Sequence, residues 1–139
     1  MADHPLGTVL VVDDSRDISD LVEQILVDEG FAVSLLPGGS AETIRAAVAD
    51  LEPDCILLDG GSTLGYDASW ATAARLAARP QAVPVIMFTA HVAAIREAEQ
   101  GESRRSVAAG FAGILPKPFD LDRLDRLVAT VSRAAQAAR

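Results

Sequence analysis

Thr8-Val9-Leu10-Val11-Val12-Asp13-Asp14 is the stretch from which the fold of this chain is predicted. Its first five residues form a continuous rather than an alternating run, which is typical of a strand buried on both faces of a parallel sheet. A segment of helical periodicity follows over residues 16–29, and its apolar stripe is made of Ile18, Leu21, Val22, Ile25 and Leu26. A buried strand followed by an amphipathic helix is the repeating unit of α/β folds.

The same strand–helix unit recurs along the rest of the chain. Apolar runs predict further strands at residues 31–36, 55–58, 83–88 and 113–115. Helical periodicity predicts helices at residues 40–51, 67–77 and 121–138, and within 92–109 either one long solvated helix or two short ones. In the helix that Ser40 caps, the residues expected to face inward are Ile44, Ala47, Val48 and Leu51.

Five such units predict a flavodoxin-like (βα)5 fold, which is a doubly wound, parallel five-stranded sheet with strand order 2-1-3-4-5. A length of 139 residues is that of one domain, and the chain shows no internal repeat. We therefore expect a single domain over residues 1–139, with its core at about residues 7–137.

Composition and charge argue against several classes of protein. Hydrophobic residues make up 50% of the chain and charged residues 23%, which is typical of a globular domain rather than a disordered one. The net charge of −8 opposes binding to nucleic acid or an anionic membrane, because both are bound mainly through basic side chains. Cys55 is the only cysteine, and no apolar run is as long as a membrane span. With no signal peptide at the N-terminus, we expect a cytoplasmic protein.

Polar side chains follow four of the five predicted strands: Asp13 and Asp14, then Asp59, Thr89 and Lys117. Ligands of open α/β sheets bind at the carboxyl ends of the strands, so these side chains are expected to converge. Three carboxylates in one crevice repel each other, and a hard divalent cation such as Mg²⁺ relieves that repulsion. A lysine and a threonine can bind phosphoryl oxygens, so the set indicates metal-assisted phosphoryl transfer with an aspartate as acceptor.

Each of these residues also has a structural interpretation. Asp13 and Asp14 can form a turn and a helix cap, Asp59 can be a turn residue, and Thr89 can cap the helix after it. Lys117 can be an ordinary surface lysine, although its place between two prolines favours a role in the site. His91 is either a modulator of the phosphoryl chemistry or an exposed loop histidine.

Four motifs together resemble the signature of response regulator receiver domains of two-component signalling, over almost the whole chain. They are Val11-Val12-Asp13-Asp14-Ser15, Leu57-Leu58-Asp59, Phe88-Thr89-Ala90 and Pro116-Lys117-Pro118-Phe119. The resemblance implies that Asp59 is the phosphoacceptor and that Thr89 and Lys117 bind the phosphoryl group. It also implies that Asp13, Asp14, Asp59 and the backbone carbonyl of Gly61 hold Mg²⁺, and that the Lys117–Pro118 peptide is cis.

Three features depart from the usual pattern of that family. Ile114 occupies the position at which an aromatic residue usually acts as a rotating switch. The loop at residues 60–65 lacks the usual proline. Lys117 follows Thr89 by 28 residues, several more than usual, and the excess falls in the extended segment 96–106. These departures leave the expected phosphorylation chemistry intact and leave open how the signal is transmitted.

We therefore expect a single-domain response regulator that accepts a phosphoryl group from a sensor histidine kinase or a phosphotransfer protein. It would catalyse only its own phosphorylation and dephosphorylation and signal by phosphorylation-dependent binding to a downstream protein, with homodimer formation left open. The alternative is a pseudo-receiver, which is an interaction module that acts without phosphorylation. Ile114 and the glycine-rich loop at residues 60–65 are the features that suggest it. A Mg²⁺-dependent phosphatase is a third hypothesis, which the lack of a substrate-capping segment disfavours.

Overall fold

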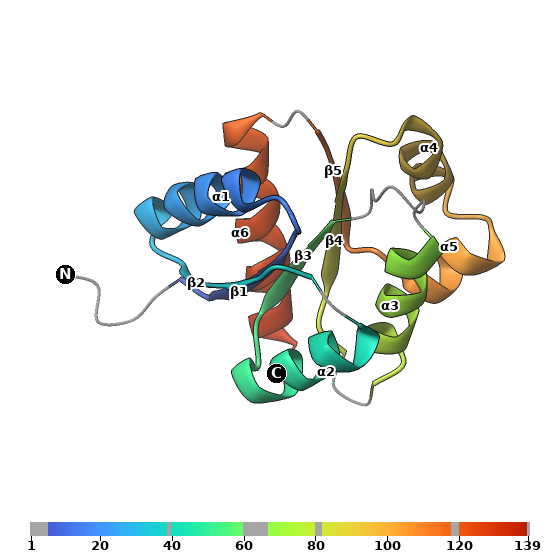
Figure 1. Cartoon of the computed structure of the whole chain (residues 1–139), viewed down its shortest axis with the longest axis horizontal. Helices are drawn as coiled ribbons and strands as arrows, with labels where there is room; N and C mark the ends of the chain where they lie inside the picture. Colours follow the sequence, from blue (N-terminus) through green and yellow to red (C-terminus); the bar gives the residue numbers. More distant parts are fainter. Residues whose placement is uncertain (1–5, 39, 60–66, 80–81, 118–119, 139) are drawn as a thin grey trace.

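In the computed structural model, five parallel strands form one sheet in the order β2-β1-β3-β4-β5 (Figure 1). The structure describes residues 6–38, 40–59, 67–79, 82–117 and 120–138. The strands are β1 (Thr8–Val12), β2 (Ala32–Leu36), β3 (Cys55–Asp59), β4 (Val85–Thr89) and β5 (Gly113–Pro116). The flavodoxin-like architecture and the strand order are confirmed.

The helices that connect the strands are α1 (Arg16–Glu29), α2 (Ala41–Leu51), α3 (Asp67–Ala77), α4 (Val92–Gln100), α5 (Arg104–Ala109) and α6 (Leu121–Ala137). The 92–109 region, for which one or two helices were expected, forms two. Gly101 ends α4 in a left-handed conformation with φ of 66°, and Ser103 caps α5 by accepting a hydrogen bond from the Ser106 backbone N–H. The polar segment 96–106 therefore consists of the end of α4, a turn and the start of α5, and it is not a single long helix.

The sheet is covered on both faces, which explains why its strands read as continuous apolar runs. Val9 and Val11 of β1 pack into a core with α1 and α6, whereas Leu10 and Val12 pack into a second core with the other helices. Figure 1 shows α1 and α6 on one side of the sheet and α2, α3 and α5 on the other. Cys55 is a core side chain of β3, and burial raises the pKa of its thiol to about 12.

Strand pairing moves several boundaries from their predicted positions. β4 begins at Val85 and not at Val83, because Val85 is the first residue of β4 that pairs with β3; Pro84, which has no N–H, contributes only its carbonyl, to the Ile56 N–H. At the other end, β3 extends to Asp59, β4 to Thr89 and β5 to Pro116, one residue beyond each prediction. Asp59 and Thr89 are thus paired residues of the sheet and not residues of the loops that follow it.

Two leucines that were expected to face inward are exposed. Leu21 of α1 is 46% exposed and Leu51 of α2 is 38% exposed. The buried faces of these helices are narrower than their apolar stripes: α1 buries Val22 and Leu26, and α2 buries Ile44 and Val48. Leu51 is the last residue of α2, after which the chain turns away at Glu52 with a left-handed φ of 47°.

Within the described ranges, the structure contains no helix whose length and apolar character would suffice to cross a membrane.

Candidate functional site

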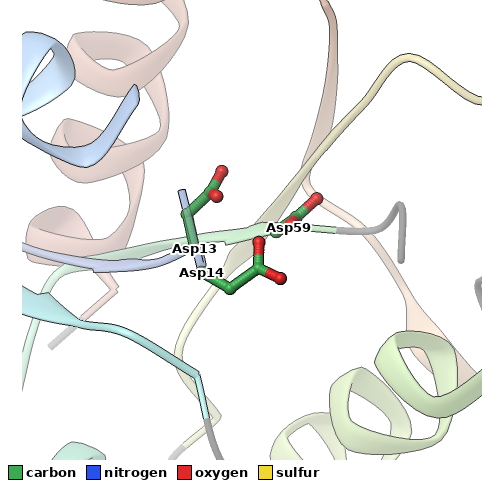
Figure 2. Close-up of side chains that lie close together, drawn as sticks. All are labelled: Asp13, Asp14 and Asp59. Atoms are coloured by element: carbon green, nitrogen blue, oxygen red, sulfur yellow. The ribbon is translucent and has the colours of Figure 1, made fainter. Parts of the chain in front are cut away.

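Three aspartates meet at the carboxyl edge of the sheet (Figure 2). Asp13 and Asp14 follow β1, and Asp59 is the last residue of β3, which is hydrogen-bonded to β1 in parallel register. One carboxylate oxygen from each residue lies within 4.8 Å of the others. Asp13 is only 2% exposed, Asp59 is partly buried and Asp14 is exposed, so the cluster opens toward solvent on the Asp14 side.

The turn after β1 holds Asp13 in place. Its Oδ1 accepts a hydrogen bond from the Ser15 backbone N–H (2.8 Å), and its backbone carbonyl accepts one from the Ser19 hydroxyl (3.3 Å). Ser15 itself caps α1 by accepting from the Ile18 N–H. Because Ser15 provides the cap, the capping interpretation of Asp13 and Asp14 is wrong.

Lys117 lies between two of the carboxylates. Its Nζ donates to Asp13 Oδ2 (3.0 Å) and to Asp59 Oδ1 (3.2 Å), and it lies 4.5 Å from the centroid of the Phe88 ring. The Lys117 backbone N–H donates to the Thr89 carbonyl, which ties the residue to the end of β4. Lys117 is the only lysine of the chain. Its hydrogen bonds join it to Asp59 and Asp13, which lie 58 and 104 residues away in the sequence.

Thr89 and His91 form the junction between β4 and α4. Thr89 is fully buried, and its Oγ1 accepts a hydrogen bond from the His91 backbone N–H (3.0 Å). The exposed His91 caps α4 by accepting from the Ala94 N–H at Nδ1 (3.4 Å). The prediction that Thr89 could cap this helix is therefore wrong. His91 has a structural role that neither sequence interpretation included.

Ser69 is a residue of the site that the sequence did not reveal. It lies in the first turn of α3 and its hydroxyl donates to the backbone carbonyl of Asp59 (2.8 Å). A serine near the start of a helix is usually interpreted as a cap, and no sequence signal marks a contact across ten residues. The contact links α3 directly to the strand end that carries Asp59.

Ile114 is an apolar residue packed against the core on the α2–α5 side of the sheet. It lies in β5, opposite Met87 of β4. Gly61 and the Lys117–Pro118 peptide, to which a carbonyl ligand and a cis bond were assigned, fall outside the described residues.

The charges of the cluster do not balance, because three carboxylates face one ammonium group. Carboxylate oxygens are hard donors of the kind that Mg²⁺ and Ca²⁺ bind, and a divalent cation would offset the excess negative charge. The donor set is thus consistent with a metal site. The neighbouring Lys117 and Thr89 add an ammonium group and a hydroxyl at the same edge, so the site can bind an anion beside a cation.

Comparisons with known proteins point to one family. The sequence model of the response regulator receiver domain matches residues 9–129. The chain is 31% identical to the transcriptional regulatory protein TctD of Salmonella typhimurium in an alignment of 133 positions that covers 91% of this chain and 53% of TctD. It is 29% identical to the receiver domain of NtrX from Brucella abortus, whose crystal structure matches 90% of this chain and 98% of that chain with a TM-score of 0.71.

The fold is also that of the chemotaxis response regulator CheY4 of Vibrio cholerae, with a TM-score of 0.70 and 22% identity over 89% of this chain and 97% of CheY4. The chain spans about half the length of TctD and 28% of the length of a longer NtrX structure from Brucella abortus.

Proposed function

Because the chain belongs to the response regulator receiver domain family, we propose that it accepts a phosphoryl group on Asp59 from a sensor histidine kinase or a phosphotransfer protein. The observation that carries the proposal is the position of Asp59. It ends a buried strand, lies beside the carboxylates of Asp13 and Asp14, and pairs with Lys117 at 3.2 Å. A nucleophile, a divalent-cation site and an anion-binding ammonium group are the parts that phosphoryl transfer requires.

In the proposed transfer, an oxygen of the Asp59 carboxylate attacks the phosphorus of a phosphohistidine. A P–O bond forms as the P–N bond breaks, and the released imidazole nitrogen takes up a proton from water. The product is an acyl phosphate on Asp59. Lys117 and the Thr89 hydroxyl stabilise the charge on the phosphoryl oxygens, because Thr89 ends β4, which pairs with β3, and Lys117 Nζ lies 3.2 Å from Asp59 Oδ1.

Asp13, Asp14 and Asp59 are proposed to hold Mg²⁺, together with the Gly61 carbonyl. The ion supplies neutralisation of the phosphoryl and carboxylate charges when it is bound. The ordered Asp13 and the exposed Asp14 have different tasks in this arrangement. The hydrogen bond from Ser15 fixes Asp13, whereas Asp14 borders the open side, where a phosphodonor must approach.

Thr89 provides a route from the phosphoryl group to α4. Its hydroxyl oxygen accepts from the His91 N–H, and its hydroxyl proton can be donated to a phosphoryl oxygen. A shift of Thr89 toward the phosphoryl group would therefore pull on the first turn of α4. We propose that the change at this helix alters binding to a downstream protein, which is the output of the domain.

The test is to incubate the chain with acetyl phosphate and Mg²⁺ and to measure the intact mass. We expect wild type to gain the mass of one phosphoryl group, and Asp59→Asn to gain none. Asp20→Asn, which changes an exposed carboxylate of α1, is the matched control and should behave as wild type. A gain in Asp59→Asn equal to that of wild type would refute the assignment, as would an undiminished gain after chelation of Mg²⁺.

The pseudo-receiver remains the second candidate, because Ile114 places an ordinary apolar side chain where the family carries its aromatic switch. This candidate predicts that a partner binds with equal affinity in the presence and absence of the phosphoryl mimic beryllofluoride. A difference of tenfold or more, about 1.4 kcal/mol, would favour the phosphorylation-dependent function.

A further inference from the structure

Three arginines meet where the first turns of α2 approach the end of α3. Arg45 of α2, Arg75 of α3 and Arg79, which follows α3, line a pocket of about 420 Å³ with Glu42. The Glu42 carboxylate lies 3.7 Å from Arg45 and 3.6 Å from Arg75, and all three of these side chains are largely exposed. Figure 1 shows the beginning of α2 next to the last turn of α3. Three guanidinium groups against one carboxylate leave a local positive charge in a chain whose net charge is −8.

Arg79, which lines this pocket, has a buried hydrogen-bond donor. Its Nη1 is buried, and no hydrogen-bond acceptor for it is found in the part of the chain that the structure describes. A buried donor without an acceptor is unfavourable, and a guanidinium group binds carboxylates through two parallel hydrogen bonds. A rotation of the guanidinium group would expose this donor to the pocket, where an incoming carboxylate would satisfy it.

Arg79 also lines a second, larger groove of about 1060 Å³. This groove lies at the amino ends of β3 and β4, which is the edge of the sheet opposite to Asp59. Most of its lining side chains are small and apolar, and they come from several helices and strand ends: Val48, Ala77, Val83, Ala109, Val131 and Ala134. Short side chains leave the groove wide, so that bulky apolar groups of a ligand can enter it.

Two acidic residues, Glu52 and Asp54, also line the groove. The Asp54 carboxylate already accepts hydrogen bonds from the Thr8 N–H (2.9 Å) and from Gln136 Nε2 (3.3 Å). Glu52 lies at the turn after α2. One end of this surface is basic, at Arg45, Arg75 and Arg79, and the rest is mostly apolar, with the two carboxylates at its β3 end.

We propose that this surface, the basic pocket together with the apolar groove, binds a segment of a partner protein that carries acidic residues at one end and bulky apolar residues along the rest. Charge complementarity argues for the acidic end, since the net negative charge of the domain repels such a segment from most other surfaces. The groove volume lies at the upper limit for small-molecule pockets, about 300–1,000 Å³, which favours a peptide over a small ligand.

The experiment selects peptides from a random displayed library on the immobilised full chain, and then measures the best binder by fluorescence anisotropy. We expect enrichment of peptides that join Glu or Asp residues to Leu or Phe. We expect Arg79→Gln and Arg75→Gln each to weaken binding about tenfold or more, since each removes a charged hydrogen-bond donor. Arg96→Gln removes an exposed arginine of α4 instead and should leave the affinity unchanged.

The same peptide should bind Asp59→Asn as tightly as wild type, because the surface lies at the opposite edge of the sheet from Asp59. The measurement with Asp59→Asn therefore distinguishes a failure of the peptide-binding proposal from a failure of the proposed phosphorylation. Affinity should also fall as salt is raised, and replacing the acidic residues of the peptide with lysine should abolish binding. Selected peptides without acidic residues, or binding by Arg79→Gln and Arg75→Gln as tight as that of wild type, would overturn the inference. So would arginine-dependent binding to vesicles of anionic phospholipid without any peptide binding, or dimerisation through this face.

Discussion

Two clusters of the molecule contain charged side chains whose charges are balanced differently. One is the acidic cluster at the carboxyl edge, and the other, here called the Trp70 cluster, consists of Trp70, Glu97, Ser103 and Arg105. At the carboxyl edge, three carboxylates share one ammonium group. In the Trp70 cluster, Glu97 of α4 accepts from Arg105 Nε and Nη2 at 2.6 Å each and from the Ser103 hydroxyl at 2.6 Å. The Arg105 guanidinium carbon lies 5.1 Å from the centroid of the Trp70 ring.

The difference indicates which cluster serves structure and which is suited to binding. Glu97 and Arg105 neutralise each other and join α4 to α5, while Trp70 contacts Phe111 in a T-shaped arrangement at 5.2 Å. Such a closed set needs no further ligand. The acidic cluster has three carboxylates against one ammonium group, and an added divalent cation would offset the excess negative charge. Three predictions test this contrast, and a fourth concerns Asp125 of α6, which lies outside both clusters.

Trp70→Ala should produce the largest effect, a loss of about 3–5 kcal/mol in the free energy of unfolding. Trp70 is 1% exposed and its removal would leave a cavity between α3 and α5. Urea unfolding followed by far-ultraviolet circular dichroism measures the loss. Trp70→Phe, which keeps an aromatic ring, should cost less. A loss below about 1 kcal/mol would show that the cluster does not stabilise the fold.

Lys117→Met should act on phosphoryl transfer instead. It removes the donor to Asp13 and Asp59 and should slow phosphorylation by acetyl phosphate about 10²–10³-fold, as the loss of one preorganised charge-stabilising donor does elsewhere. Lys117→Arg keeps the positive charge and should retain more activity. The rate is measured by intact mass over time. A rate equal to that of wild type would mean that Lys117 only neutralises the carboxylates.

Glu97→Gln should give a smaller effect, on stability alone. The pair with Arg105 is partly exposed, so its loss should cost about 1 kcal/mol or less. Phosphorylation by acetyl phosphate should be unchanged, and Glu99→Gln, which alters an exposed residue of the same helix, should leave the stability near that of wild type. If Glu97→Gln slowed phosphorylation as strongly as Lys117→Met, the contrast between the two clusters would fail.

Asp125→Asn should give the smallest effect, with the opposite sign. Burial, the charges of Glu29 and Asp122, and a hydrogen bond with Glu29 all raise the pKa of Asp125. A carboxyl group whose pKa is raised in the folded state favours folding when it is protonated. Its contribution to the free energy of unfolding therefore falls as the pH rises from its ordinary pKa to its raised pKa. The amide should therefore stabilise the protein at pH 7 by about 0.2–0.5 kcal/mol, the size of like-charge effects between helix neighbours.

Unfolding in urea at two pH values measures this difference. The gain of Asp125→Asn should vanish at a pH below the ordinary aspartate pKa, about 4, where wild type is protonated as well. Asp50→Asn, at an exposed position of α2, is the control and should show no such pH dependence. A gain that persists at acidic pH would mean that packing and not charge is responsible.

Much of the fold and of the site followed from local patterns. The uninterrupted run before Asp13 predicted a central strand, and β1 indeed lies between β2 and β3. Since parallel strands end at one edge, the spacing of Asp13, Asp14 and Asp59 was enough to predict that they converge. The end of α4 at Gly101 was one of two predicted possibilities, since the sequence allowed either one helix or two within residues 92–109. A polar helix and a polar turn have the same composition, so composition did not distinguish them.

The sequence by itself determined the strand–helix order, the parallel sheet and the acidic edge, because these depend on hydrophobic periodicity and on residues directly after strands. The tertiary structure alone decided that Ser69 holds the Asp59 carbonyl, that Arg105 lies over Trp70, and that Arg45, Arg75 and Arg79 surround one pocket. It also decided that Leu21 is exposed although it belongs to the apolar stripe of its helix. The reason is that such contacts depend on how helices pack across the sheet, and helix packing is not encoded in the spacing of residues within one helix.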